Sequence, residues 1–479
     1  MPAPPEVPGR PGRDRSGGPG SPDDPLDLAA VRRIHVVGIG GAGMSAIATV
    51  LRAMGMAVTG SDLKESPVTR RLLGQGIDVR IGHQPANLGP VDLVTCSPAV
   101  PESNPEIQEA RRRGVPVARR SAVLAAIADR RRTIAVAGTH GKTTTASMLA
   151  LVLVEAGLRP SFLIGADVNE IGTNAVWDRG EWLVVEADES YGTFGALRPE
   201  VAIVTNVEAD HLDHYGTFAE LRRAFARFVA GARGGAVVWA DDPVAAELGQ
   251  AVGARSVGTD PGSDYRLERI SLSRSAVGFE LIGPGGTGDR LEVPVPGRHN
   301  AANAALAAVA ALGVGVPLAV VTRALARFAG VPRRFEFRGE ANGVTFVDDY
   351  AHLPTEVRAT LAAARAGRWA RVVAVFQPHR YTRTAALARQ FGTAFVDADA
   401  LVVTDVYGAG ETPVPGVSGR SVADAVAEQD PRLPVVYAPS REELRAAVVR
   451  LLAPGDLCCT LGAGDLTTLP DELLAVPEW

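Results

Sequence analysis

The sequence predicts an α/β protein of about three domains, and three observations support this fold class. The chain has 479 residues, which is too long for one hydrophobic core and fits about three domains of ordinary size. Short runs of β-branched residues alternate with helical patterns along most of the chain, as they do in parallel sheets with crossover helices. Two of these runs lead directly into a glycine-rich turn that opens a helix.

The first expected region begins with a strand at 33–37. It continues with the glycine-rich turn Gly38–Gly43 and an apolar helix that reaches about Met54. Further strands are expected at 56–59, 91–95 and 115–117. Residues 1–28 are rich in Pro, Gly, Arg and Asp and contain no apolar segment, so we expect a disordered tail and see no signal peptide.

The second expected region opens after the basic run 130–132, with a strand at 133–136. This strand leads into the loop 138–145 and a helix that reaches about Ala156. The next expected elements are buried strands at 182–186, 201–205 and 236–240 and a β-meander with glycine-rich turns at 264–296.

The apolar run 304–321 approaches membrane-spanning length. It is mostly alanine and contains Gly313, Gly315 and Pro317, so it predicts a buried helix followed by a turn. A third region starts near Val331, and its strands are expected at 344–347, 372–376, 401–405 and 457–461, alternating with helices.

Composition and charge indicate an ordinary globular protein. Apolar residues make up 46% and charged residues 22% of the chain, and the net charge is −5, with a pI of about 6.0. This balance does not favour a polyanion such as nucleic acid as a partner. Cys96, Cys458 and Cys459 lack the spacing of metal ligands. Cys458 and Cys459 are adjacent in an apolar run, which predicts buried free thiols and fits a reducing cytoplasm.

The first glycine-rich turn, Gly38–Gly43, has the features of an anion site. Backbone N–H groups converge where a strand meets a helix N-terminus, and the helix dipole adds positive potential. Asp62 follows about 20 residues later, as in dinucleotide-binding folds. Two interpretations remain open, namely a nucleotide or diphosphate site and a tight turn in which glycine only permits close packing.

The second loop, 138–145, predicts nucleotide binding more strongly. Gly138-x-x-Gly141-Lys142-Thr143 supplies backbone amides for phosphate oxygens, an ammonium for the γ-phosphate and a hydroxyl for Mg²⁺. The loop is shorter than the common G-x-x-x-x-G-K-[ST] loop, and His140 is unlike a GTPase loop. Lys142 is one of only two lysines in the chain.

Acidic and histidine side chains follow the next two buried strands. Glu186 ends the strand at 182–186, where a carboxylate would lie beside the phosphate loop and could hold Mg²⁺; a solvated acidic strand end is the alternative. His211 follows the strand at 201–205 and is a candidate ligand for a second metal. Most of the eight histidines lie in polar motifs at strand ends, which favours chemistry over core filling.

As a set, the motifs resemble those of the Mur ligase family and occur in the family's order from about residue 33 to 466. The stretches that carry the resemblance are 38–45, 138–145, 186–190, 205–211, 296–303, 333–335, 348–352, 376–384, 405–411 and 462–465. The sequence departs from the family pattern at Leu353, where a second histidine is usual, and at Tyr191, where an aspartate is usual.

The resemblance implies a three-domain α/β fold. The implied domains are a Rossmann-like UDP-sugar-binding domain at 29–131, a central P-loop-type ATP-binding domain with a mostly parallel sheet at 132–330 and a Rossmann-like ligase domain at 331–479. Since the phosphate loop and the third-domain residues lie in different domains, we expect domain closure.

The resemblance also implies an activity. Within the family, the motifs are most similar to those of members that use ATP and Mg²⁺ to join L-alanine to the carboxylate of UDP-N-acetylmuramate through an acyl-phosphate, in peptidoglycan precursor synthesis. The implied protein is a cytoplasmic monomer or homodimer that neither binds nucleic acid nor inserts into a membrane.

Residue roles follow from the resemblance by position. Lys142 corresponds to the γ-phosphate lysine, and the implied magnesium ligands are Thr143, Glu186 and His211. The implied nucleotide contacts are the loop residues Gly138, Thr139, His140, Gly141, Lys142, Thr143 and Thr144, the adenosine contacts Asn300 and Asn303, and the third-domain residues Arg334 and Asp349. The implied catalytic group is Lys142, His211, Arg334, His352, Arg380 and Arg383.

The substrate side is implied in the same way. His352, Arg380 and Arg383 resemble groups at the amino-acid end, and the two arginines, three residues apart, are expected to share a helix face; surface ion pairs are the alternative. The loop under the UDP diphosphate corresponds to Gly40, Gly41, Ala42, Gly43, Met44 and Ser45, with Asp62 near the nucleoside.

Three other functions remain open. A nicotinamide-dependent dehydrogenase would use Gly38–Gly43 and Asp62 but leaves Lys142 and Glu186 without a role. A non-catalytic UDP-sugar sensor would not need them either. A ligase that attaches a recycled tripeptide to UDP-N-acetylmuramate would share the chemistry.

Overall fold

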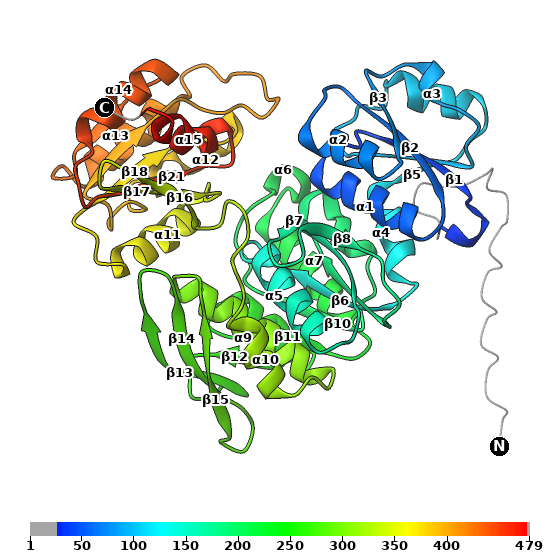
Figure 1. Ribbon diagram of the computed structural model, residues 1–479, viewed down its shortest axis with the longest axis horizontal. Helices are drawn as coiled ribbons and strands as arrows, with labels where there is room; N and C mark the ends of the chain where they lie inside the picture. The colour runs from blue at the N-terminus through cyan, green and yellow to red at the C-terminus, as the bar shows by residue number, and fades with distance from the viewer. Residues whose placement is uncertain (1–25, 477–479) are drawn as a thin grey trace, which may run out of the picture. The chain divides into compact units, whose positions relative to one another are not determined.

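The computed structural model describes residues 26–476 (Figure 1). The chain divides into two compact units, Met1–Ile127 and Ala128–Trp479. Most of the predicted tail lies outside the described residues. Within it, Asp27 accepts a hydrogen bond from Ala29 N–H and Leu28 is buried, so these two residues of the expected tail belong to the folded first unit.

The first unit is a five-stranded parallel sheet in the order β3-β2-β1-β4-β5. Its strands are β1 (Arg33–Val37), β2 (Ala57–Asp62), β3 (Asp78–Ile81), β4 (Leu93–Cys96) and β5 (Val117–Arg119), and its helices are α1 (Ala42–Ala53), α2 (Pro67–Gly74), α3 (Pro105–Arg112) and α4 (Arg120–Ala128), with single turns η1 (Leu28–Ala30) and η2 (Pro85–Asn87). The chain order reverses between β1 and β4, and ligands of doubly wound sheets bind at such a switch point. The turn Gly38–Gly43 follows β1 at that point.

The second unit begins with a ten-stranded sheet in the order β15-β14-β13-β12-β11-β10-β6-β9-β7-β8. Its strands are β6 (Arg132–Ala137), β7 (Ser161–Val168), β8 (Thr173–Val176), β9 (Trp182–Glu186), β10 (Val201–Val204), β11 (Ala236–Trp239), β12 (Arg255–Gly258), β13 (Tyr265–Leu272), β14 (Val277–Ile282) and β15 (Gly288–Val293). The sheet is parallel from β7 to β13 and antiparallel at both ends. The antiparallel end β13–β15 confirms the predicted meander.

The helices of this part are α5 (Lys142–Glu155), α6 (Leu212–Tyr215), α7 (Phe218–Ala230), α8 (Pro243–Gln250), α9 (Arg298–Gly313) and α10 (Leu318–Leu325), with the turn η3 (Ser190–Ala196). α5 and α9 pack against each other and against the sheet. Both helices are buried along most of their length, which explains why neither shows an amphipathic pattern. The run 304–321 therefore contains a buried helix and a turn at Gly315, as predicted, and also the first turn of α10.

The remaining sheet has six strands in the order β16-β17-β21-β18-β19-β20, and only β16 pairs antiparallel. Its strands are β16 (Glu336–Ala341), β17 (Val344–Asp349), β18 (Val372–Phe376), β19 (Ala400–Val403), β20 (Val435–Tyr437) and β21 (Leu457–Leu461). Its helices are α11 (Pro354–Ala366), α12 (Tyr381–Phe391), α13 (Gly419–Gln429), α14 (Arg441–Leu451) and α15 (Leu469–Leu474), with η4 (Asp465–Thr468).

Helices cover both faces of this sheet. Phe376 of β18 belongs to a core with α11, α12 and α13, whereas its neighbour Val375 belongs to a core with α14 and α15. This alternation is the period of two along a strand that is buried on both sides. With three sheets that are mainly parallel, the α/β fold class is confirmed.

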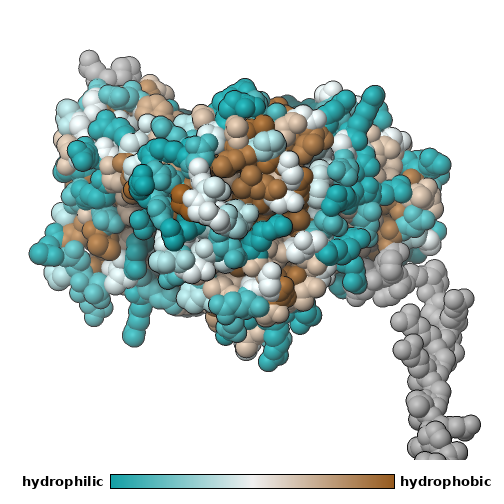
Figure 2. Space-filling view, turned by 90° about the horizontal axis from the view of Figure 1, so that it is seen from below, coloured by the Kyte–Doolittle hydropathy of each residue, from teal (hydrophilic) through white to brown (hydrophobic). Residues whose placement is uncertain are grey.

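The surface has an ordinary mixture of side chains. Figure 2 shows one face, where hydrophilic residues surround a hydrophobic area near the centre. The large apolar side chains that are most exposed, Leu63, Phe337 and Val396, lie far apart in the sequence. Within residues 26–476, no helix combines the length and apolar composition needed to cross a bilayer.

Candidate functional site

The phosphate loop, residues 138–145, connects β6 to α5. Gly138 and Gly141 both have positive φ, +137° and +78°. A Cβ would lie 1.9 Å from Thr205 Oγ1 at Gly138 and 2.4 Å from Asn303 Oδ1 at Gly141. Both positions therefore require glycine, and the loop is pressed against the end of β10 and the first turns of α9. The first-turn N–H groups of α5 have no carbonyl within the helix, as at other anion sites.

Lys142 folds back over this loop. Its Nζ donates to Glu189 Oε2 at 2.8 Å and Oε1 at 3.0 Å, and to the carbonyl of Gly138 at 2.7 Å. Burial opposes the charged form, but the carboxylates of Glu189 and Asp188 outweigh it and raise the pKa of Lys142. The ammonium is therefore a fixed positive charge at the phosphate loop, with Glu189 as its counter-ion.

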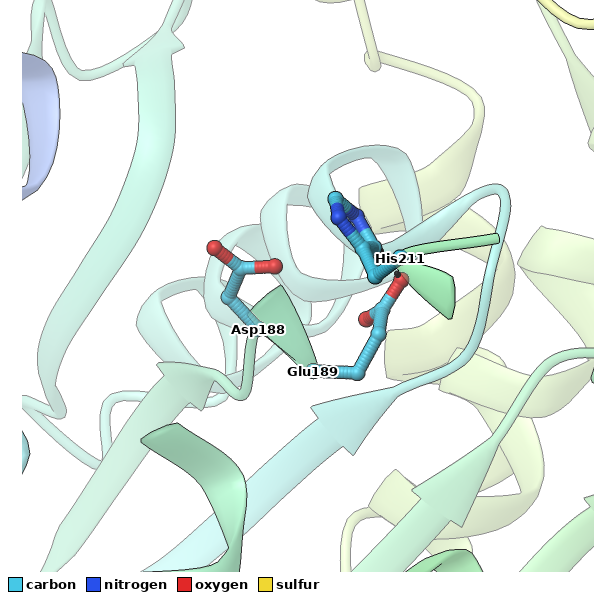
Figure 3. Close-up of side chains that lie close together, drawn as sticks. All are labelled: Asp188, Glu189 and His211. Atoms are coloured by element: carbon cyan, nitrogen blue, oxygen red, sulfur yellow. Dashed lines mark ion pairs between the residues drawn. The ribbon is translucent and has the colours of Figure 1, made fainter. Parts of the chain in front are cut away.

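The predicted metal ligands occupy two neighbouring positions around Lys142. Thr143 Oγ1 donates to Glu186 Oε1 at 3.1 Å. His211 lies with Asp188 and Glu189, and one ligand atom from each of the three lies within 4.8 Å of the others (Figure 3). Burial lowers the pKa of His211, which favours the neutral imidazole that can bind a metal.

These residues fit a magnesium site by their chemistry. Carboxylate and hydroxyl oxygens are the ligands that Mg²⁺ prefers, and it shares them with nucleotide phosphates. Sequence reasoning did not select Asp188 and Glu189 as ligands, although both lie in the acidic run 186–190. They were missed because only the structure shows that His211 reaches them.

A cavity of about 420 Å³ opens beside the loop. That volume is in the range of small-molecule sites, about 300–1,000 Å³. Predicted residues from four separate stretches of the chain line it, namely His140, Gly141, Thr143, Thr144, Asn300, Asn303, Arg334 and Asp349. The other loop residues, Gly138, Thr139 and Lys142, are not among its lining residues; Thr139 Oγ1 instead accepts the N–H of Glu208 at 2.8 Å.

The polar groups of this cavity are held in fixed positions. Asn300 Nδ2 donates to the carbonyl of Pro296 at 2.7 Å, and Asn303 Nδ2 donates to Asn300 Oδ1 at 3.2 Å. Asp349 accepts the N–H groups of Phe335 and Ala351, and burial raises its pKa to about 6. The guanidinium of Arg334 lies over the ring of Tyr350, 5.0 Å from its centroid.

A second group of predicted residues surrounds Asp210. Arg383 donates to Asp210 Oδ1 at 3.3 Å and lies 3.0 Å from His379 Nδ1. The rings of His352 and His379 are 5.8 Å apart between centroids. Asp210 Oδ2 is in turn 3.5 Å from His211 Nε2. The structure thus brings His352 and Arg383 close to the metal candidates, through an aspartate that sequence reasoning did not select.

The expected shared helix face of Arg380 and Arg383 is wrong. Arg380 is the N-cap of α12, with a φ of 68°, and the helix begins at Tyr381. Its N–H donates to the carbonyl of Tyr407 at 2.8 Å. Because the backbone of Arg380 is left-handed, helical spacing does not relate the two arginines.

In the first unit, Asp62 holds the loop after β1. Its Oδ2 accepts the N–H of Gly40 at 2.8 Å, and a Cβ at Gly40 would lie 2.9 Å from the same oxygen. Gly41 is the N-cap of α1, and Ala42 and Gly43 form its first turn. Met44 and Ser45 are buried, so a diphosphate at this loop would meet their backbone rather than their side chains.

A buried carboxylate lies behind this loop. Glu106 of α3 has a fully buried side chain and contacts His35 Nε2 at 3.4 Å, Asn87 Nδ2 at 2.6 Å and the hydroxyl of Ser61. Burial opposes the charge, but the hydrogen bonds from His35, Ser61 and Asn87 outweigh it and lower the pKa of Glu106 to about 2. Ser61 also accepts Gly38 N–H through its carbonyl, so this network supports the start of the loop.

Family models cover most of the chain. The model described as "Mur ligase family, catalytic domain" matches residues 33–132, "Mur ligase middle domain" matches 136–311 and "Mur ligase, glutamate ligase domain" matches 333–464. A protein of Anaeromyxobacter dehalogenans (strain 2CP-1) named UDP-N-acetylmuramate–L-alanine ligase is 49% identical over 452 residues, which are 93% of this chain and 98% of that protein.

Solved structures are similar over the same length. A crystal structure of UDP-N-acetylmuramate–alanine ligase from Thermotoga maritima has a TM-score of 0.79 and 31% identity, and the match covers 92% of this chain and 98% of that one. A murein peptide ligase from Psychrobacter arcticus has a TM-score of 0.67 and 26% identity, with 93% and 98% of the two chains covered.

Proposed function

This chain belongs to the Mur ligase family, and from that premise we propose that it is an ATP-dependent ligase that joins L-alanine to the carboxylate of UDP-N-acetylmuramate in peptidoglycan precursor synthesis. The observation that carries this proposal is the 49% identity to an L-alanine ligase over 98% of that protein's length. The phosphate loop, acidic ligands and cavity of the second unit supply the parts that the reaction needs.

The chemistry requires activation of a carboxylate. A carboxylate oxygen is a poor leaving group, so the muramyl carboxylate attacks the γ-phosphorus of ATP, forming an acyl-phosphate and releasing ADP. The neutral amine of L-alanine then attacks the acyl carbon, and inorganic phosphate leaves from the tetrahedral intermediate. Lys142 and Arg334 offset the negative charge on the γ-phosphoryl group during its transfer.

The acidic residues beside Lys142 would hold Mg²⁺. Thr143 and Glu186 form one proposed site, and His211 with the carboxylates of Asp188 and Glu189 forms the other. Bound magnesium neutralises phosphate charge and orients the oxygens of the nucleotide. Lys142 and Glu189 are already paired there, so the chain itself places a cation among these carboxylates.

In this proposal the nucleotide and the acceptor bind to different residues. Adenosine lies in the cavity with Asn300, Asn303 and Asp349, and the phosphates lie at loop residues Gly138–Thr144. His352, Arg380 and Arg383 face the amino acid and the acyl group, and Arg383 can bind a carboxylate through its guanidinium. The UDP diphosphate lies on the loop Gly40–Ser45, which Asp62 holds in place.

The sheets support three domains at 29–131, 132–330 and 331–479, because each range contains one complete sheet. Three free cysteines among the described residues fit a reducing cytoplasm, which we propose as the location. The proposed protein is a monomer or homodimer.

The recycling ligase that attaches a tripeptide is the nearest alternative. The two solved structures differ in their similarity to this chain, with TM-scores of 0.79 for the alanine ligase and 0.67 for the murein peptide ligase, and this order favours L-alanine. A dehydrogenase or a non-catalytic sensor would leave the Lys142 site without a task.

A phosphate-release assay tests the proposal. The purified protein is incubated with UDP-N-acetylmuramate, ATP and Mg²⁺, and with L-alanine, L-serine, glycine or the tripeptide in turn. We expect phosphate release and a UDP-linked product with L-alanine, and loss of about 100-fold or more in Lys142→Met, as when other enzymes lose a group that stabilises transition-state charge. Release with the tripeptide alone would assign the recycling reaction, and no release with any acceptor would refute ligase activity.

A further inference from the structure

His140 lies in the phosphate loop between two carboxylates from separate parts of the second unit. Its Nδ1 is 3.0 Å from Glu356 Oε1 and its Nε2 is 3.2 Å from Glu208 Oε2. Glu208 follows β10, next to the loop, whereas Glu356 belongs to α11 in the range 331–479. A histidine is not required for binding phosphate here, because backbone amides, Lys142 and Thr143 already supply the groups for that.

Glu356 is fixed to its own helix. Its Oε2 accepts the N–H groups of His352 at 2.9 Å and Leu353 at 3.2 Å, which caps the start of α11. The carboxylate therefore moves with α11 and cannot follow His140 independently. Thr355, in the same turn, donates to Glu208 Oε2 at 2.8 Å. Thus His140, before α5, and Glu208, after β10, are joined to Glu356 and Thr355 of α11.

The bridge carries a positive charge at its centre. Burial disfavours the imidazolium, but the carboxylates of Glu356 and Glu208 outweigh it and raise the pKa of His140 to about 9. The ring is 16% exposed and the Glu356 side chain 11%, so water screens this pair little. Breaking this charge-assisted contact costs free energy, because it either leaves one charge buried without its partner or requires both groups to be exposed to water.

The bridge also forms part of the nucleotide cavity. His140, Glu208, Thr355 and Glu356 all line the 420 Å³ cavity, together with Asn303 and Asp349. Gly141, the next residue after His140, lies against Asn303. Any shift of His140 toward or away from α11 therefore moves the backbone that would bind the phosphates.

We propose that His140 and Glu356 form a charge bridge that couples nucleotide binding at the phosphate loop to the docking of α11 and its sheet. The bridge makes both side chains positioning residues, since neither needs to touch the reacting atoms. This inference rests on the proposed function in one respect, because it assumes that the loop binds the phosphates of a nucleotide. The coupling is reciprocal, so docking of α11 strengthens nucleotide binding and nucleotide binding strengthens docking.

A double-mutant cycle on nucleotide affinity tests the bridge. The dissociation constant of Mg²⁺–ADP is measured by calorimetry for the wild type, His140→Gln, Glu356→Gln and the double variant. We expect each single variant to bind ADP about 10-fold to 100-fold more weakly, within the usual range of coupling between sites. The double variant should bind no more weakly than the poorer single variant, because the second change removes nothing further.

The matched control is Glu428→Gln on the exposed side of α13, which should bind ADP like the wild type. The KM for UDP-N-acetylmuramate should stay within about 2-fold in all variants, because the bridge acts on the loop at 138–145 and the proposed UDP site lies in the first unit. The bridge would be refuted if the single variants bind ADP like the wild type. It would also be refuted if the fold-increases in the ADP dissociation constant multiply in the double variant.

Hydrogen exchange gives a second measurement that does not depend on the variants remaining folded. In the wild type, ADP should slow amide exchange both in residues 138–145 and in the first turns of α11, residues 353–358. Protection confined to the loop would show that the two are not coupled. The bridge and the ligase function can fail separately. If the wild type is an active ligase but the two substitutions have independent effects on ADP affinity, only the bridge is refuted. If the wild type is inactive but ADP slows exchange in α11, only the ligase assignment is refuted.

Discussion

Three largely buried cations of the candidate site are each paired with a carboxylate, and these pairs determine what each functional side chain can do. Lys142 is held by Glu189, His140 by Glu356 and Arg383 by Asp210. Removing one member of such a pair leaves a buried charge without compensation, which typically costs about 3–5 kcal/mol. A substitution at one of these positions should therefore be compared with a substitution of its partner, because a loss of activity can come from the unpaired charge that remains.

The pair of Glu106 and His35 gives a stability prediction with a definite pH dependence. The pKa of Glu106 is lowered from 4.5 to about 2 in the folded protein. Its contribution is therefore fully present above pH 4.5 and is lost as the pH falls toward 2. We expect Glu106→Gln to lower the free energy of unfolding of the first unit by about 2–3 kcal/mol at pH 7, and by about half as much near pH 3.

Urea unfolding at pH 7 and pH 3 measures this difference, with pulsed hydrogen exchange on peptides from β1 to β5 as the readout. Glu102→Gln is the control in the same unit, because the Glu102 side chain is 81% exposed and surface ion pairs contribute little. An equal deficit at both pH values would contradict the assigned charge of Glu106.

At the residue scale, the positively charged residues of the site were easier to predict from the sequence than the carboxylates that pair with them. Lys142 stands out in its loop, whereas Glu189 lies 47 residues away, Glu356 lies 216 residues from His140 and Asp210 lies 173 residues from Arg383. A motif specifies local backbone geometry, but a contact between distant segments depends on how the sheets and helices pack. Glu189 and Asp210 lie in the motif stretches 186–190 and 205–211, but nothing local in the sequence indicates which cation each carboxylate contacts.

At the scale of secondary structure, the strand–turn–helix unit recurs and was predicted from sequence. The strands at 182–186, 372–376 and 457–461 have the predicted boundaries, because fully buried parallel strands are continuous apolar runs. Strands such as β20, whose three residues are only partly buried, lack that signal and were missed. Arg380 was misassigned because it lies just before the helix, as its left-handed N-cap, and no glycine marks that position.

The junction of β6 and α5 gives a prediction about glycine. Gly141→Ala and Gly157→Ala place alanine at nearly the same φ, +78° and +73°. At Gly157 no atom lies within 4 Å of the added Cβ, whereas at Gly141 the Cβ meets Asn303. Asn303 cannot simply move, because it is buried and bonded to Asn300 and Thr145.

We therefore expect Gly157→Ala to cost about 1–2 kcal/mol of stability, the strain of a left-handed alanine, without changing ADP affinity. Gly141→Ala should cost more than this and should also weaken ADP binding by about 10-fold or more, since a shift of about 1 Å at a binding loop is expensive. Thermal unfolding and calorimetry compare the two. Equal effects on both measurements would mean that the contact with Asn303 does not constrain the loop.

At the scale of the whole molecule, the chain is two compact units that contain three sheets. The proposed ligand sites divide between them, with the UDP diphosphate on the first unit and the adenine nucleotide on the second. A ligand stabilises only the unit that binds it, by about 2.7 kcal/mol at 100 times its dissociation constant.

Hydrogen exchange with single ligands tests this division. UDP should protect peptides of β1, β2 and the loop between β1 and α1, and Mg²⁺–ADP should protect peptides of β6, α5 and α9. Protection by UDP in residues 138–145 instead would contradict the assignment of the first loop to the UDP-sugar.

The pairing of Lys142 with Glu189 has a practical consequence, because the chain contains only one other lysine, Lys64. Lys64 is exposed, whereas the Lys142 side chain is only 12% exposed, so an amine-reactive reagent meets one accessible and one shielded side chain besides the chain terminus. Isotope-coded acylation followed by mass spectrometry should therefore label Lys64 and leave Lys142 largely unmodified, because Lys142 is held as an ammonium by Glu189 and only a neutral amine is acylated. With arginine at almost every other basic position, a single amine-reactive label can thus be placed at Lys64, far along the chain from the loop at 138–145, without any substitution.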